Sequence, residues 1–299
     1  MEFAAVRQFL NRIRGASGED EAAPSPETAL TPVVSHGPSR PDVWPALALR
    51  HRLCGEGFSF PDGEAEVLHL ARPLGLTEAA SVALLGAGSG GPVAAITAAF
   101  GAWVSGYEAD PALIPIALAH CRHTGQAKRA SISLWRPDAP DLPHRHFHHA
   151  LSLYALAGAP PRGILAALTG ALHPGGQLVL LDFAAPPKRG TDPAIAAWAQ
   201  REDRPPVLPC ADDITALLAN FGWDVRVVED LSDRHVATIL RAWHTLVRPM
   251  AQVRPSLTEA KLLVSEAERW LHRVRLLQSG QLRLVRWHAI AGDRAPPLA

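Results

Sequence analysis

The segment LLGAGSGGP, residues 84–92, concentrates glycine between an apolar run and an alanine-rich stretch of helical pattern. Its glycines are Gly86, Gly88, Gly90 and Gly91. Glycines in a turn between a strand and a helix let the backbone approach a ligand, and the free N–H groups of the helix start point toward that ligand. The motif alone has low specificity, but its chemistry is that of a nucleotide-binding turn.

An acid follows at the spacing that a nucleoside would need. Glu108, in the segment VSGYEAD, stands 22 residues after Gly86, where the next strand is expected to end. A carboxylate at that place accepts hydrogen bonds from both ribose hydroxyls. The pair favours an adenosine-type ligand, and the alternative is a tight turn beside an ordinary surface acid.

The elements that position these residues alternate along the chain. Short aliphatic runs predict strands, and the segments between them have helical spacing. The strands are expected at 81–85, 102–107, 130–134, 149–153, 176–182, 223–229 and 281–290, and the helices at 91–100, 111–122, 161–172, 212–220 and throughout 231–278. Within the last of these, Ser256 and Glu259 have the spacing of a capping box. This alternation indicates an α/β fold with a mostly parallel sheet covered by helices on both faces.

A third motif narrows the class. The segment LHPGGQLVLLDF, residues 172–183, places a Pro-Gly-Gly turn after a helix and before the fifth strand. With the glycine turn and Glu108, it resembles the class I S-adenosylmethionine-dependent methyltransferases over roughly residues 50–290. The resemblance implies a Rossmann-like methyltransferase three-layer sandwich, with a seven-stranded sheet, an antiparallel last strand and a helical insert. It also implies S-adenosyl-L-methionine as the cofactor.

The segment GEGFSFPDG, residues 55–63, resembles a segment of small-molecule N-methyltransferases that act on phosphoethanolamine or glycine derivatives. In that group it helps to close over the cofactor. Asp138 is the implied partner of the adenine amino group, although Asp141 is a second acid in the same loop. The other cofactor contacts that the resemblance implies are Gly57, Gly86, Ala87, Gly88, Gly90 and Glu108. Leu84 departs from the family, which has an acid there near the methionine part of the cofactor.

Methyl transfer from a sulfonium is an in-line displacement that rests on positioning and on excluding water, so no universal base is required. Side chains that would serve a protonated nucleophile are Tyr154, His235 and His244, each of which has a structural role as its alternative. Trp198 and Trp243 are expected in the core, with an aromatic cage for a methylated ammonium as the functional alternative.

These features predict a methyltransferase that acts on a small soluble acceptor at nitrogen or oxygen. A methyltransferase-like interaction or cofactor-sensing module without catalysis is the alternative that Leu84 favours. A nucleotide-dependent oxidoreductase is disfavoured because the chain has one nucleotide-binding half where that class has two.

Composition limits the partners. Lys plus Arg number 29 and Asp plus Glu number 29, so we expect neither nucleic acid nor an anionic membrane as a partner. Three cysteines and the lack of a long apolar run predict a cytoplasmic protein with no membrane span. His144, His146 and His148 alternate in an expected loop, but no cysteine or acid stands at ligand spacing, so no metal site is predicted.

The ends of the chain differ in pattern from the middle. Residues 1–15 have the spacing of an amphipathic helix, and residues 16–42, rich in proline, serine and acids, predict a flexible linker. The methyltransferase domain is expected at 43–292, with 231–278 as its helical cap insert and 293–299 as a tail. Helix 2–14 is predicted to bind a protein partner or a second copy of the chain, and the alternative is that it packs onto the domain.

Overall fold

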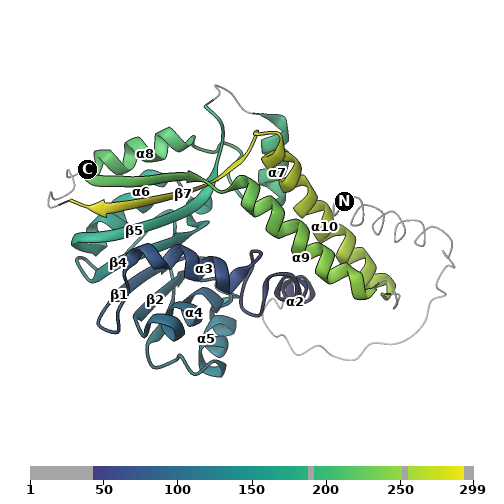
Figure 1. Ribbon diagram of the computed structural model, residues 1–299, viewed down its shortest axis with the longest axis horizontal. Helices are drawn as coiled ribbons and strands as arrows, with labels where there is room; N and C mark the ends of the chain where they lie inside the picture. Colours follow the sequence, from purple (N-terminus) through teal and green to yellow (C-terminus); the bar gives the residue numbers. More distant parts are fainter. Residues whose placement is uncertain (1–42, 188–191, 251–254, 293–299) are drawn as a thin grey trace, which may run out of the picture.

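The computed structural model describes residues 43–187, 192–250 and 255–292, and it has a seven-stranded sheet at its centre (Figure 1). The strand order is β3-β2-β1-β4-β5-β7-β6. The strands are β1 Ser81–Leu85, β2 Trp103–Glu108, β3 Ala130–Leu134, β4 Phe147–Leu153, β5 Leu172–Ala184, β6 Trp223–Asp230 and β7 Arg283–Ala291. The pairs among β1 to β5 are parallel, and β7 runs antiparallel to both of its neighbours. The predicted sheet and its antiparallel last strand are confirmed.

Helices cover both faces of the sheet because alternate strand residues are apolar on both sides. In β1, Val82 and Leu84 belong to one buried cluster, whereas Ala83 and Leu85 belong to the other. The first cluster includes residues of α3 Gly63–Ala71, α4 Gly91–Phe100 and α5 Ile114–His123. The second includes residues of α6 Pro161–Ala171 and α8 Ala211–Asn220. The three-layer arrangement is therefore as predicted.

The sequence patterns missed α2 Val43–Cys54, the short α3 and α7 Pro193–Arg201. Helices of 9 residues, such as α3 and α7, are too short to establish a period. In α2, the sequence VWPALALRHRLC lacks a continuous apolar stripe, so its helical form depends on packing against the rest of the protein.

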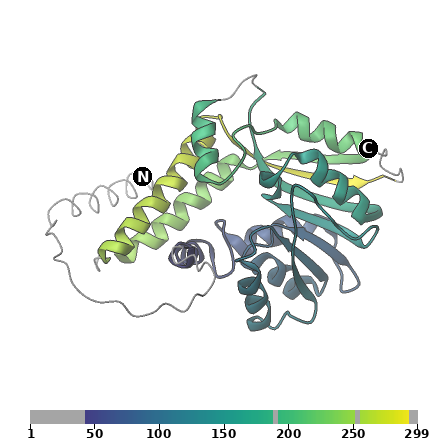
Figure 2. The ribbon, with the colours of Figure 1, turned by 180° about the vertical axis from the view of Figure 1, so that it is seen from behind.

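The helical insert lies between β6 and β7 and consists of α9 Ser232–Met250 and α10 Leu257–Gln278. Figures 1 and 2 show the two helices side by side, projecting from the sheet, with α2 against them. The predicted helical region 231–278 is interrupted at Pro255 and Ser256, and its second helix begins directly after Ser256, as the capping-box spacing predicted. Ser256 caps α10, and its Oγ accepts a hydrogen bond of 3.2 Å from the Glu259 amide.

We predict a Pro-Gly-Gly turn ahead of the fifth strand, and this prediction is wrong. β5 already begins at Leu172, so these residues lie inside it. Phe147 pairs with Leu172, and His149 pairs with Gln177, so the extra residues of β5 are accommodated in an irregularity of the ladder. Gly175, with φ of 75°, allows that irregularity.

An ion network fixes α2 on the insert. Glu266 of α10 accepts hydrogen bonds from Arg50 of α2 at 3.0 Å, from Arg269 at 2.8 Å and from the Trp270 indole at 3.1 Å. The Glu266 side chain is only 7% exposed, which strengthens these charge-assisted bonds. The segment 55–63 follows α2 directly, so this network also anchors the entrance to that segment.

The predicted helix 1–15, linker 16–42 and tail 293–299 lie outside the described residues. None of the helices in the described ranges is long and apolar enough to cross a membrane. Among the same residues, no group of three or more His, Cys, Asp or Glu side chains is arranged to hold a metal ion.

Candidate cofactor and acceptor site

The glycine turn joins the carboxyl end of β1 to the start of α4. The amides of Gly86 and Ala87 both donate to the carbonyl of Tyr107, at 2.9 and 3.1 Å, so the turn is fixed to the neighbouring strand β2. Gly86 has φ of 79°, and a Cβ there would lie 2.1 Å from the carbonyl oxygen of Leu153. Only glycine therefore fits at this contact between β1 and β4.

Glu108 ends β2 and faces the same turn, as predicted. Its Oε2 accepts a hydrogen bond of 2.6 Å from the Gly88 amide, and its Oε1 accepts one of 3.0 Å from the Asp110 amide. Burial raises the pKa of this carboxyl, and backbone hydrogen bonds from Asp110, Gly88 and Ala109 oppose that rise. Each carboxylate oxygen can accept a further bond, so the group can still bind ribose hydroxyls.

Two features of the turn fit a bound nucleoside. A Cβ added at Gly88 would meet no atom within 4 Å, so there is open space beside the backbone. Ser89 is fully buried, and its Oγ has no hydrogen-bond partner. A buried polar atom without a partner is unfavourable unless a ligand or water completes it. The residues at the turn therefore fit the adenosine-containing cofactor that the sequence resemblance implies.

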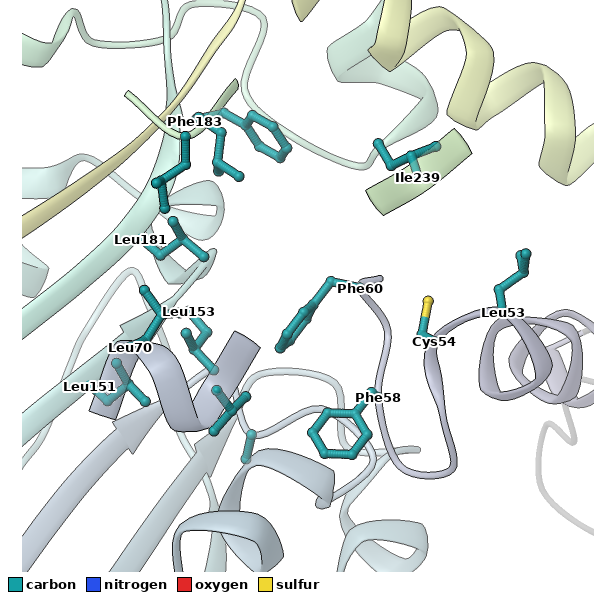
Figure 3. Close-up of a cluster of buried hydrophobic side chains, with 14 of the residues drawn as sticks. Leu53, Cys54, Phe58, Phe60, Leu70, Leu151, Leu153, Leu181, Phe183 and Ile239 are labelled. Carbon is teal, nitrogen blue, oxygen red and sulfur yellow. The ribbon is translucent and has the colours of Figure 1, made fainter. Parts of the chain in front are cut away.

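The segment 55–63 lies against the first turn of α4. The carbonyl of Gly57 accepts a hydrogen bond of 3.0 Å from the Gly91 amide, and a Cβ at Gly57 would lie 2.9 Å from the backbone of Gly91. The rings of Phe58 and Phe60 are buried beyond this contact. Figure 3 shows Phe60 between the strand residues Leu153 and Leu181 and Ile239 of α9. The Gly57–Gly91 hydrogen bond places the segment next to the glycine turn.

Asp138 lies on the surface of the loop that follows β3. Its carboxylate forms an ion pair of 2.7 Å with Arg136, and that guanidinium lowers the pKa of Asp138. Asp141, the other acid of this loop, contributes to the raised pKa of Tyr107, although burial is the larger cause. A role for either acid at the adenine stays a prediction.

The structure brings two of the three candidate acid–base residues together. Tyr154 follows β4 with φ of 56°, and its ring lies 5.7 Å from that of Phe60 and 5.5 Å from that of Phe183. Tyr154 and His235 line one cavity. His244 comes nine residues after His235 in α9 and so projects from the opposite side of the helix.

Burial determines the protonation of the pair. It lowers the pKa of His235 to about 3, with the nearby Arg273 adding to the effect, and it raises the pKa of the Tyr154 hydroxyl. Both side chains are therefore neutral near pH 7. A neutral imidazole with so low a pKa accepts a proton weakly but forms hydrogen bonds well.

A buried ion pair, which the sequence patterns did not identify, supports Tyr154. Asp182 of β5 binds Arg204 at 2.8 Å, with side chains 1% and 8% exposed. The Asp182 carboxylate also accepts from the Leu156 amide at 2.8 Å, and Arg204 donates to the Tyr154 carbonyl at 3.4 Å. The one available signal was the acid in the apolar run LVLLDF, because Arg204 is distant in sequence.

Leu84 and the two tryptophans lie in the core. Leu84 is fully buried between Gly106 of β2 and Leu151 of β4, so no carboxylate occupies this place near the turn. Trp198 and Trp243 are also buried, as expected.

Comparison of the sequence with models of protein families and with curated proteins gives no match. Comparison of the structure with solved structures does find similar proteins. Phosphoethanolamine N-methyltransferase 2 of Haemonchus contortus, in complex with phosphomonomethylethanolamine and S-adenosylhomocysteine, is similar with a TM-score of 0.72 and 15% identity, over 83% of this chain. The chain spans 57% of the length of that protein.

Two further structures share the arrangement. A proposed sarcosine dimethylglycine methyltransferase of Galdieria sulphuraria has a TM-score of 0.66 and 15% identity, covering 83% of this chain and 98% of its own. Geranyl diphosphate C-methyltransferase of Streptomyces coelicolor, bound to S-adenosyl-L-homocysteine, has a TM-score of 0.63 and 13% identity, covering 77% and 76%. The chain therefore has the Rossmann-like fold of S-adenosylmethionine-dependent methyltransferases, as the sequence predicted.

Proposed function

We propose that the protein is an S-adenosylmethionine-dependent methyltransferase that acts on a small soluble acceptor at nitrogen or oxygen. The observation that carries the proposal is the hydrogen bond of 2.6 Å between the Glu108 carboxylate and the Gly88 amide. It joins an acid suited to ribose to a glycine turn with open space beside it. The fold of the similar methyltransferases supports the same function.

Each part of the site has a role in holding the cofactor. Glu108 would bind the ribose hydroxyls, and the backbone of Gly86, Ala87, Gly88 and Gly90 would lie along the cofactor. The segment containing Gly57 would cover it, and Asp138 would bind the adenine amino group after leaving Arg136. When bound, S-adenosylmethionine supplies an electrophilic methyl group on a positively charged sulfur.

The protein's own contribution to methyl transfer is position and exclusion of water. The rings of Phe60 and Tyr154 form an apolar wall beside the turn, and such a wall keeps water from competing with the acceptor. The Asp182–Arg204 pair fixes the backbone of Tyr154. His235, which lines the cavity beside Tyr154, is neutral, and this suits a displacement that needs no strong base.

Calorimetry with S-adenosylhomocysteine, S-adenosylmethionine and NAD, in parallel on the full chain, tests this function. We expect the first two to bind and NAD to bind far more weakly. Failure of both sulfur compounds to bind at millimolar concentration, with the fold verified by circular dichroism, would instead support a non-catalytic interaction module.

We also propose that the protein is cytoplasmic, which three free cysteines support, and that residues 2–14 bind a protein partner or a second copy. Deletion of residues 1–42 is then expected to leave the melting temperature and cofactor affinity unchanged while removing the association, measured by light scattering. A loss of several kcal/mol of stability would show that these residues pack on the domain.

A further inference from the structure

Helix α5 packs directly against the glycine turn. A Cβ at Gly90 would lie 2.7 Å from the carbonyl oxygen of Ala117 and 2.9 Å from its Cα, so the backbone of the turn and that of α5 are in contact. The Sγ of Cys121, one helical turn further along α5, lies 4.0 Å from the Gly90 carbonyl oxygen. The face of α5 that contains Ala117 and Cys121 therefore supports the turn.

A histidine on this face of α5 also contacts the segment 55–63. His120 comes three residues after Ala117 and so lies on the same side of the helix. A Cβ at Gly57 would lie 2.8 Å from His120 Nε2 and 2.9 Å from the backbone of Gly91. Gly57 is thus held between the His120 ring and the start of α4.

This packing fixes the polar contact between the segment and α4. The carbonyl of Gly57 accepts a hydrogen bond of 3.0 Å from the amide of Gly91, the first residue of α4. Gly57 has φ of 84°, and glycine has more backbone freedom than any other residue. A packed neighbour is therefore needed to keep its carbonyl directed at Gly91, and the His120 ring is such a neighbour.

The His120 ring is neutral in this position. Burial lowers its pKa, Glu56 opposes that change and His123 adds to it. Burial also lowers the pKa of His51 in α2, again with Glu56 opposing and with His120 adding to the effect. A proton on His120 is unfavourable while Gly57 covers the ring, because the charged form loses its hydration there.

We propose that His120 is a positioning residue of the cofactor site, which holds Gly57 against the start of α4 and so keeps the segment 55–63 closed over the cofactor. The inference rests on the proposed function, because it takes this segment as the cover of bound S-adenosylmethionine. His120 acts through Gly57 and does not itself bind the cofactor. Helix α5 is thereby one of the elements that determine cofactor affinity.

Calorimetry with S-adenosylhomocysteine on the full chain at pH 7.5 tests the inference. We expect His120→Ala, which removes the contact with Gly57, to raise Kd roughly three- to tenfold, because the closed segment becomes less populated. His120→Gln keeps a planar polar group and is expected to retain most of the affinity. His123→Ala, the same change at an exposed position of α5, is the control. Equal affinity of folded His120→Ala and the control would overturn the inference.

The pH profile of Kd distinguishes positioning from a general loss of stability. When the segment leaves, His120 regains water and its pKa returns toward 6.5, so protons favour the open form. The Kd of the native chain should therefore rise as the pH falls from about 7.5 to about 5.5, across the ordinary range of histidine. In His120→Gln the rise should be smaller, whereas His51 and Glu108 contribute equally in both proteins. Identical pH profiles would contradict the inference.

Hydrogen exchange at the Gly91 amide, followed by NMR without cofactor, tests the contact itself. We expect faster exchange at Gly91 in His120→Ala than in the native chain, with the amides of β1 unchanged. The same exchange rate at Gly91 in both proteins would refute the inference. Failure of the native chain to bind S-adenosylhomocysteine, with exchange at Gly91 altered as expected, would count against the proposed function instead.

Discussion

The Oε2 atom of Glu108 lies 2.6 Å from the amide nitrogen of Gly88, and this bond joins the end of β2 to the turn between β1 and α4. The second carboxylate oxygen is held by the Asp110 amide at 3.0 Å. The carboxylate is thus oriented before any ligand arrives, which lowers the entropy lost on binding.

Replacement of Glu108 by alanine is expected to weaken S-adenosylhomocysteine binding. Loss of a charge-assisted hydrogen bond to ribose costs about 1.5–3 kcal/mol, which is roughly a 10- to 150-fold rise in Kd. Glu78→Ala is the control, because that acid has a side chain 79% exposed and pairs with Arg129. Equal affinity of the two variants in calorimetry would remove Glu108 from the site.

Alanine at Gly86 and at Gly88 should separate folding from binding. At Gly86 the new Cβ would meet the Leu153 carbonyl at 2.1 Å, so Gly86→Ala is expected to lower stability by more than about 3 kcal/mol. At Gly88 the Cβ meets nothing, and with φ of 56° we expect a cost of only about 1–2 kcal/mol.

The smaller folding effect makes Gly88→Ala the binding test. Its methyl group would occupy the open space where the cofactor should approach, so affinity for S-adenosylhomocysteine should fall while the fold persists. Urea denaturation measures the stability of each variant, and calorimetry measures its affinity for S-adenosylhomocysteine. Undiminished affinity in Gly88→Ala would show that the ligand does not lie along this backbone.

Leu84→Asp introduces the acid that the family resemblance implies at a place that is apolar in this chain. Leu84 is fully buried, so an unpaired carboxylate there is expected to cost at least about 3 kcal/mol. Burial raises the folded-state pKa of such a carboxyl, so the loss should be largest at high pH and smaller as the pH falls.

Urea denaturation of Leu84→Asp between pH 5 and 8 measures that loss, with Leu84→Met as a volume-matched control. If the variant folds, its S-adenosylhomocysteine affinity should differ from that of the native chain by no more than about tenfold, or ~1.4 kcal/mol. Cofactor binding that appears only in the variant would indicate that the native site has decayed.

His235 should make stability depend on pH. The unfolded chain takes up a proton near the ordinary histidine pKa of 6.5, whereas the folded chain, with a pKa of about 3, does not. The free energy of unfolding should therefore fall as the pH falls below 6.5, by about 1.4 kcal/mol per unit from this residue.

In His235→Leu that contribution disappears. Between pH 7.5 and pH 5, urea titrations should show the native chain losing about 2 kcal/mol more than the variant. Parallel curves for the two proteins would mean that His235 is protonated in the folded state, which would contradict its neutral role in the cavity.

Local patterns in the sequence already determined much of the fold and part of the site. The strands alternate with helices at their own periods, and the glycine turn and Glu108 each end a predicted strand, so parallel pairing brings them to one edge. Ser256 was recognised as a helix cap because capping depends on neighbours three residues apart. Such features follow from the chemistry of short segments.

The tertiary structure alone decided which side chains face the cavity and how their charges are paired. Tyr154 and His235 are 81 residues apart, and Glu66 and Arg234 are 168 apart, yet packing places all four around one space. The sequence offered an aromatic cage around Trp198 only as an alternative to a core position. In the structure, the guanidinium of Arg204, paired with Asp182, lies over the Trp198 ring. No local period in the sequence predicts these contacts, because they join segments that are distant along the chain. The low pKa of His235 has the same origin, since it results from burial when those segments pack together and exclude water.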